Sequence, residues 1–360
     1  MDSVTYRWFR EGDEPALLEL LQAAFGRWPG VDVPCEPIEH LRWKLAVPNG
    51  ATACCVAVRG GEIIAAQICA FQHFLLHGRE VTALRGWDTA THPHYQRLGL
   101  MQKLRSFRIA EVHGRCDFEI GTWTNHPAMA ALHEHDGRLD LGGGSEVLIA
   151  PVTARAALSA LKVRLRVPGK LVRSSAAFAR WAGARRAAAR VDHAFVIRDI
   201  ARFDDRANEF GAQASKQFSL ILERTSEYLN WRYCDQRGGS FAVKIAEEEG
   251  QILGYAVLRI NGGRAHLADI LVLPGREDVV RALANAIIHE ARNRGLDRLE
   301  FLAPKTHPFR RALADSGFVG RRARKVPPSY LPLRMSSEEL SSLSSPGFVF
   351  HWVIGDSDII

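Results

Sequence analysis

The sequence predicts a mixed α/β protein with mixed sheets, built from two copies of one fold. Three observations lead to this prediction. At 360 residues the chain is long enough for two domains of ordinary size. Short segments with alternating polarity are interspersed with segments whose apolar residues recur at helical spacing, which indicates strands mixed with helices. Motifs of the first half also recur, in the same order, in the second half.

The composition is that of an ordinary globular protein. Hydrophobic residues make up 47% and charged residues 24% of the chain, which excludes a disordered or fibrous protein. No apolar run approaches the roughly 18 to 20 residues of a membrane span, and the first residues lack the apolar region of a signal peptide. The six cysteines have no zinc-ligand spacing and are typical of reduced thiols. We therefore expect a cytoplasmic protein without a bound metal.

The net charge of +7 comes from one segment. Ten basic residues and a single acid lie between Pro151 and Asp192, so the rest of the chain is slightly acidic. This segment is rich in Ala and Arg and predicts a connector with helical turns. The alternative, a helix that binds a membrane surface or nucleic acid, lacks a sustained apolar stripe and has few aromatic residues. We expect domains at 1–150 and 193–360, a connector at 151–192 and no nucleic-acid partner.

The first half predicts an order of elements that is not a simple series of parallel βαβ units. Val4–Phe9 alternates in polarity as a strand does, and Asp13 precedes a helix with an apolar stripe of Leu17, Leu18, Leu21 and Phe25. The turn Gly60-Gly61 separates two strands. The remaining elements are expected to be a helix at 37–45, strands at 53–59, 62–71 and 80–91, a helix at 100–113, a strand at 116–123 and a short helix at 127–135.

Short repeats indicate a duplication. Leu41–Leu45 resembles Leu229–Tyr233, and Gly61–Ala66 resembles Gly250–Tyr255 at nearly the same separation. A third pair, Ala131-Leu132 and Ala312-Leu313, precedes a glycine in both places. Solenoid repeats are only about 20 to 50 residues long, so two copies of one domain are the better interpretation. In the second copy, apolar periodicity predicts a helix at 277–294 and a strand at 299–303.

The stretch from Gly86 to Met101 has the features of an anion site. A strand ends at Thr91, a loop with Gln96, Arg97 and Gly99 follows, and an amphipathic helix begins at Leu100. The first N–H groups of a helix have no intrahelical partner and lie at the positive end of its dipole. A glycine lets the backbone approach a ligand closely. This combination favours a pyrophosphate. The sequence has no P-loop, nucleophile-elbow or H-E-x-x-H motif.

This stretch resembles the coenzyme A signature of the GCN5-related N-acetyltransferase (GNAT) family. Gln96 and Gly99 match the motif Gln/Arg-x-x-Gly-x-Gly/Ala, and Met101 replaces its last small residue. The resemblance covers roughly residues 3–145 and implies two tandem acyl-CoA acyltransferase domains, the second of them degenerate. It implies acetyl-CoA as acyl donor and these donor-binding residues: Thr89, Ala90, Thr91, Gln96, Arg97, Leu98, Gly99, Leu100, Met101 and Asn125.

The resemblance also implies how an amine is acetylated. A backbone N–H of 89–91 would hold the thioester oxygen. Asp88 would deprotonate the amine, with Glu119 as a weaker candidate, and His133 stands where the family usually places its tyrosine acid. A structural ion pair for Asp88 and a surface position for His133 are the alternatives. Tyr95 is expected to pack beside the loop.

The acceptor implied by the resemblance is a primary amine on a small molecule or sugar. Trp43, Trp87 and Trp123 are candidates to line its groove, although tryptophans usually serve packing alone. The second copy has Asp269–Gly275 where the first has its basic glycine loop, so we expect it to bind no donor and to close the acceptor groove. Two other functions remain open: an acyltransferase that uses long-chain or carrier-bound donors, and a non-catalytic protein that binds coenzyme A.

Overall fold

The computed structural model describes residues 3–48, 50–121, 138–141, 144–157, 194–322, 329–343, 345 and 347–357. The predicted short helix at 127–135 and nearly all of the basic connector lie outside these ranges. None of the described helices is long and apolar enough to cross a membrane. The six cysteines are free thiols, and four of them are buried.

The described first half contains the strands and helices that periodicity predicts up to residue 121, and two strands at 139–140 and 145–151 that it did not predict. Their bounds are β1 (Thr5–Trp8), α1 (Glu14–Phe25), α2 (Pro37–Leu45), β2 (Cys55–Arg59), β3 (Glu62–Leu76), β4 (Arg79–Thr91), α3 (Leu100–Val112), β5 (Phe118–Gly121), β6 (Leu139–Asp140) and β7 (Ser145–Pro151). The strand predicted at 62–71 continues to Leu76 as β3. Phe25, expected on the apolar stripe of the first helix, is 46% exposed because it lies at the last position of α1. Arg108 of α3 is buried.

The second half repeats this order and continues into a C-terminal region. Its main elements are β8 (Val196–Ile200), α7 (Arg206–Ser215), β9 (Leu220–Leu222), α8 (Ser226–Leu229), β10 (Phe241–Glu248), β11 (Gln251–Asn261), β12 (Arg264–Val272), α9 (Glu277–Asn293), β13 (Arg298–Pro304), α10 (Arg310–Asp315) and β14 (Val319–Arg322). The C-terminal region adds β15 (Ser329–Pro332), α11 (Ser337–Leu343) and β16 (Phe350–His351), followed by a single turn at Ile354–Asp356.

Helices cover both faces of the first sheet. Val56 and Ala66, paired across β2 and β3, pack with the leucines of α1 and α2, whereas the next pair, Ala57 and Ala65, packs with Leu104 of α3. Successive side chains of a strand point to opposite faces, so this alternation places α1 and α2 on one face and α3 on the other. We call these the α1 face and the α3 face.

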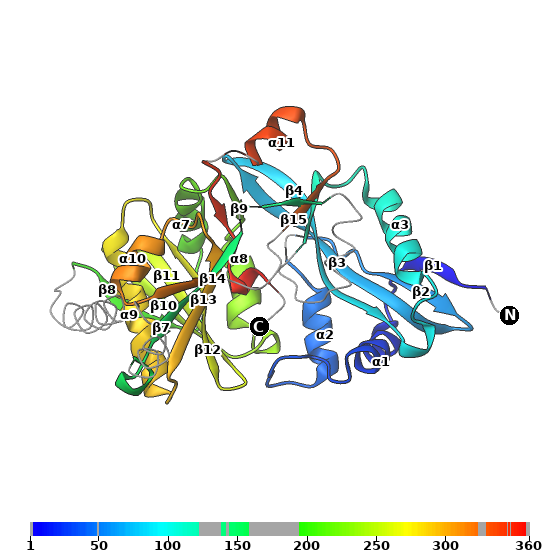
Figure 1. Cartoon of the computed structure of the whole chain (residues 1–360), viewed down its shortest axis with the longest axis horizontal. Coiled ribbons are helices and arrows are strands. Elements are labelled where there is room, and N and C mark those ends of the chain that lie inside the picture. The colour runs from blue at the N-terminus through cyan, green and yellow to red at the C-terminus, as the bar shows by residue number, and fades with distance from the viewer. Residues whose placement is uncertain are drawn as a thin grey trace, which may run out of the picture.

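Each sheet contains strands from the other half of the chain: the first includes β15 and, through pairing of β9 with β3 and of β16 with β9, two more, and the second includes β7. The first sheet has the order β1-β2-β3-β4-β5-β15-β6, and the second has the matching order β8-β10-β11-β12-β13-β7-β14. β15, from the end of the chain, lies between β5 and β6, while β7, from the first half, lies between β13 and β14. Figure 1 shows orange β15 beside the cyan strands and green β7 among those of the second half.

A reciprocal contact joins the two copies. The indole N–H of Trp43 donates to the carbonyl of Trp231 at 2.9 Å, and that of Trp231 donates to the carbonyl of Trp43 at 3.1 Å. Their rings stack with centroids 4.7 Å apart. Trp43 and Trp231 are equivalent residues of the repeated segments Leu41–Leu45 and Leu229–Tyr233. The repeated segment is therefore the place where α2 meets the second copy.

Candidate functional site

Strands β4 and β5 pair in parallel at three positions among the described residues. Ala83–Arg85 pair with Phe118–Ile120; β4 runs to Thr91, and the described part of β5 reaches Gly121. The β5-facing backbone of residues 86–91 thus has no strand partner among the described residues. A bulge lies in the same part of β4, where Trp87 and Asp88 oppose the single residue Ile68. Bulges redirect side chains, often next to active sites.

The loop after β4 has the backbone expected of an anion site. Gly99, the residue before α3, has φ +69°, and a side-chain carbon added there would have no neighbour within 4 Å. Arg97 also adopts a positive φ, +64°. Residues 96–99 are exposed, and no side chain caps the helix. The unpartnered N–H groups at the start of α3 and the charge of Arg97 fit a diphosphate.

The other predicted donor residues divide into backbone and side-chain roles. Ala90 packs into the core under α1 and Leu100 into the core under α3, so only their backbones can contact a ligand. Met101 also packs on the α3 face. Its large side chain, at the position where the family motif has a small residue, is therefore directed away from the loop. Tyr95 packs in the same cluster, as expected. Asn125, with His133 and Trp123, lies outside the described residues.

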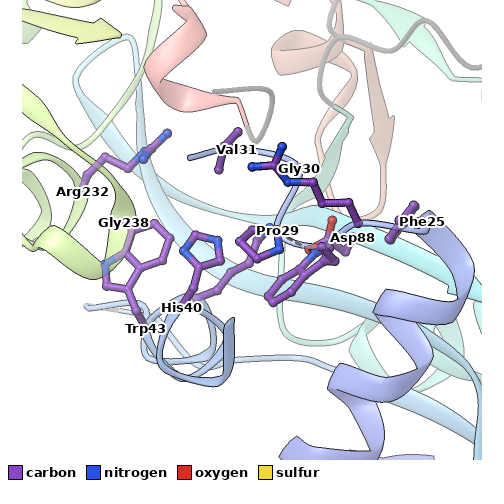
Figure 2. Close-up of a pocket in the computed structure, with 12 residues that line it drawn as sticks. Phe25, Pro29, Gly30, Val31, His40, Trp43, Asp88, Arg232 and Gly238 are labelled. Atoms are coloured by element: carbon purple, nitrogen blue, oxygen red, sulfur yellow. Dashed lines mark hydrogen bonds and ion pairs between the residues drawn. The ribbon is translucent and has the colours of Figure 1, made fainter. Parts of the chain in front are cut away.

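Asp88 lies on the α1 face, at the edge of a cavity. Its Oδ2 accepts hydrogen bonds from Lys44 Nζ at 2.7 Å and from Trp28 Nε1 at 3.1 Å. The cavity holds about 290 Å³ and is open to solvent. Figure 2 shows its lining, which comes from both copies: Phe25, Arg27, Trp28, Pro29, Gly30, Val31, His40, Trp43, Lys44, Asp88, Arg232 and Gly238.

Sequence reasoning did not identify His40, which lines this cavity. Its ring stacks on Trp43 at 5.2 Å and lies 5.3 Å from Trp28. Burial, together with the charge of Lys44, lowers the pKa of His40 to about 4, so the ring is neutral near pH 7. Its Nδ1 lies 2.6 Å from the carbonyl of Arg237 and donates to it, which leaves Nε2 as an acceptor. The sequence feature that could have identified His40 is its place four residues before Lys44, because this spacing puts both side chains on one face of α2.

Glu119, the weaker candidate for the base, belongs to a buried ion cluster. Its carboxylate accepts from Arg108 at 2.8 Å and from Arg138 at 2.7 Å. Burial alone would raise the pKa of Glu119, but the two arginines outweigh it and hold the pKa at about 2. Such a carboxylate is a poor proton acceptor near neutral pH. Glu119 therefore has a structural role on β5, where that strand pairs with β4.

In the second copy, the positions that correspond to Asp88, to the edge of β4 next to β5 and to the start of α3 have different residues or contacts. Asp269 lies beside the corresponding bulge of β12, fully buried, and accepts from the hydroxyls of Tyr233 at 2.9 Å and Tyr255 at 2.8 Å. β12 and β13 pair at only two positions, and the C-terminal segment 350–357 packs against both strands. Glu277 and Asp278 begin α9, where they would repel a phosphate.

Family models match both halves of the chain. Residues 5–118 match the acetyltransferase (GNAT) domain, and residues 207–318 match the acetyltransferase (GNAT) family. A search of curated protein sequences found no significant match. Among the described residues, no cluster of three or more side chains has the composition of a metal site.

Solved structures share the fold over almost the whole chain. A probable N-acyltransferase from Enterococcus faecalis superposes with a TM-score of 0.65 at 12% identity, over 92% of this chain and 73% of that one. A GCN5-related N-acetyltransferase from Anabaena variabilis has a TM-score of 0.62 at 10% identity and the same coverage. A tandem GNAT protein from the clavulanic acid biosynthesis pathway has a TM-score of 0.57 at 14% identity, covering 93% of this chain and 100% of its own.

Proposed function

Because the chain belongs to the GNAT acetyltransferase family, we propose that it transfers an acetyl group from acetyl-CoA to a primary amine of a small molecule in the cytoplasm. One observation supports this most strongly. In the first copy, β4 leads to a glycine loop before α3 and carries Asp88, a carboxylate at a cavity on the α1 face. Donor and acceptor would approach from opposite faces and meet between β4 and β5.

The donor would lie along the start of α3. The N–H groups after Gly99 and the guanidinium of Arg97 would bind its pyrophosphate. Its thioester would enter the gap beside β4, where a backbone N–H of Thr89–Thr91 would donate to the carbonyl oxygen. As the amine attacks, that oxygen gains negative charge, and a donor placed there contributes a few kcal/mol to the rate.

The acceptor amine would lie next to Asp88. The carboxylate would take a proton from the amine, directly or through water, as the nitrogen bonds to the carbonyl carbon. The carbon–sulfur bond then breaks and coenzyme A leaves as a thiol after it gains a proton. His133 remains our proposal for the proton donor, and the low basicity of a thiolate means that modest help is enough.

The second copy would have a structural role. Its helix α9 begins with two carboxylates, and the cleft that corresponds to the thioester gap holds the protein's own C-terminal segment. Through Arg232 and Gly238 it supplies one wall of the acceptor cavity. We therefore expect one donor per chain.

Calorimetry with acetyl-CoA and thiol release with a panel of amines test the proposal. We expect one molecule bound per chain, and no binding by Gly99→Glu, because that side chain places a negative charge beside the pyrophosphate. Gly78→Glu, in another exposed turn with positive φ, is the matched control for folding. Two donors per chain, or full affinity in Gly99→Glu, would refute the assignment. Acetyl, long-chain and carrier-bound donors compared side by side identify the acyl group, and binding without thiol release would indicate a non-catalytic protein.

A further inference from the structure

The acceptor cavity has more positive than negative charge. Among the described residues that line it, Arg27, Lys44 and Arg232 are basic and Asp88 is the one acid. Lys44 forms an ion pair with that carboxylate, and Arg27 pairs with Asp32 at the surface. His40 is neutral because its pKa is lowered to about 4. Arg232 is the cation that remains.

Arg232 is a buried arginine without a carboxylate partner among the described residues. The residue is 4% exposed, and its Nε donates to the carbonyl of Gly355 at 2.7 Å and its Nη2 to that of Ser357 at 3.3 Å. It lies over the rings of Trp43 and Phe241. A buried charge that is not neutralised is costly, so such groups are usually paired. This one lines a solvent-open cavity, where a ligand can supply the missing anion.

Aromatic rings line the cavity between Arg232 and Asp88. Trp28, His40 and Trp43 follow one another at centroid separations of 5.3 and 5.2 Å. Figure 2 shows Arg232 at one end of the cavity and Asp88 at the other, with His40 between them. Flat rings bind well to such surfaces. No serine, threonine, asparagine or glutamine appears among the described residues that line the cavity, which disfavours a neutral sugar.

We propose that the acceptor is a small aromatic amine with an anionic group at the end opposite its amine. This inference rests on the proposed acetyl transfer, since it places the amine at Asp88. The anion would pair with Arg232, and the ring would lie along Trp28, His40 and Trp43. A volume of about 290 Å³ is at the lower end for small-molecule sites, which excludes a long peptide or oligosaccharide as the bound portion.

Three amines test the class in the full-length protein. 4-(Aminomethyl)benzoate carries amine and carboxylate at opposite ends of a ring, benzylamine lacks the carboxylate, and phenylalanine carries both groups at the same end. We expect kcat/KM for thiol release from acetyl-CoA to be about 10- to 100-fold higher for the first than for either of the others, because a hydrogen bond to a charged group contributes roughly 1.5–3 kcal/mol. The difference should appear mainly in KM.

Variants locate the anion. In Arg232→Met the preference for 4-(aminomethyl)benzoate over benzylamine should disappear, and Arg232→Lys should restore part of it. Arg198→Met, which removes an exposed arginine of the second copy, should keep the full preference. Circular dichroism confirms folding of each variant. Equal use of both amines by the wild type, or an unchanged preference in Arg232→Met, would overturn the inference and leave acetyl transfer intact.

Binding of 4-methylbenzoate, which cannot be acetylated, separates the two proposals. Its affinity is measured by calorimetry and should fall at least tenfold in Arg232→Met. Binding of this kind without thiol release from any amine would overturn the proposed acetyl transfer while supporting an anion site at Arg232. Absence of binding to the wild type would overturn the anion site.

Discussion

Acid should destabilise the protein through His40, and the size of the effect follows from its surroundings. The ring is held neutral between Trp28 and Trp43, with a pKa of about 4 against an ordinary value of 6.5. The unfolded chain therefore binds the proton more tightly than the folded chain. The contribution is fully present above pH 6.5 and is lost as the pH falls towards 4. A difference of 2.5 pK units corresponds to about 3 kcal/mol, of which about 2 kcal/mol is lost by pH 5.

His40→Asn isolates this contribution, because its amide can still donate to the carbonyl of Arg237 but does not titrate. Free energies of unfolding are measured with urea at pH 7.5 and 5.0. We expect the variant to be less stable at pH 7.5, since the ring stack is lost, and the gap to the wild type to shrink by about 2 kcal/mol at pH 5.0. His307 and His351, also buried with lowered pKa values, affect both proteins equally. His289→Asn, at an exposed position of α9, is the matched control. A gap that stays constant with pH would show that the reasoning about His40 is wrong.

Three further predictions concern the architecture. Gly238→Ala should lower stability by about 1–3 kcal/mol in thermal unfolding, because the added carbon would lie 2.5 Å from the Trp43 ring; Gly114→Ala, in open space, should not. Glu119→Gln should cost roughly 3–5 kcal/mol by leaving two buried arginines without their carboxylate, and a loss below 1 kcal/mol would contradict the ion cluster. A fragment of residues 1–150 should lack a cooperative unfolding transition, since its sheet is missing β15; a sharp transition would refute this.

Periodicity predicted strands β1 to β5 of the first sheet, because the polarity pattern within each of these segments is enough to indicate a strand. Pro37–Leu45 and Leu100 mark the same helix bounds in both, and Gly99 is where the loop needs a positive φ. The family resemblance is confirmed by matches in both halves. Asp88 and its neighbours stay a prediction as catalytic groups.

Long-range arrangement was not predictable in the same way. β7 and β15 are short apolar strands, and alternation shows that a strand has a buried face but not which strand it pairs with. The helical pattern does not show that Arg108 of α3 is buried, because its partner Glu119 comes from β5. Arg232 was visible only as part of a repeat. Its role at the cavity depends on how the two copies meet.

The exchange of β7 and β15 has a consequence for the order of events during synthesis. A nascent domain ordinarily folds once its own segment has emerged from the ribosome. Here β5 lacks its partner β15 until residues 329–332 have been made. Likewise, β7 has no strand to pair with until β13 and β14 have been made. Neither copy can complete its sheet alone, so the nascent chain must stay soluble with incomplete sheets until residues 319–332 have been made. Although the chain consists of two copies of one fold, the two copies therefore fold as one unit. Deletion of either copy would leave the other with an incomplete sheet.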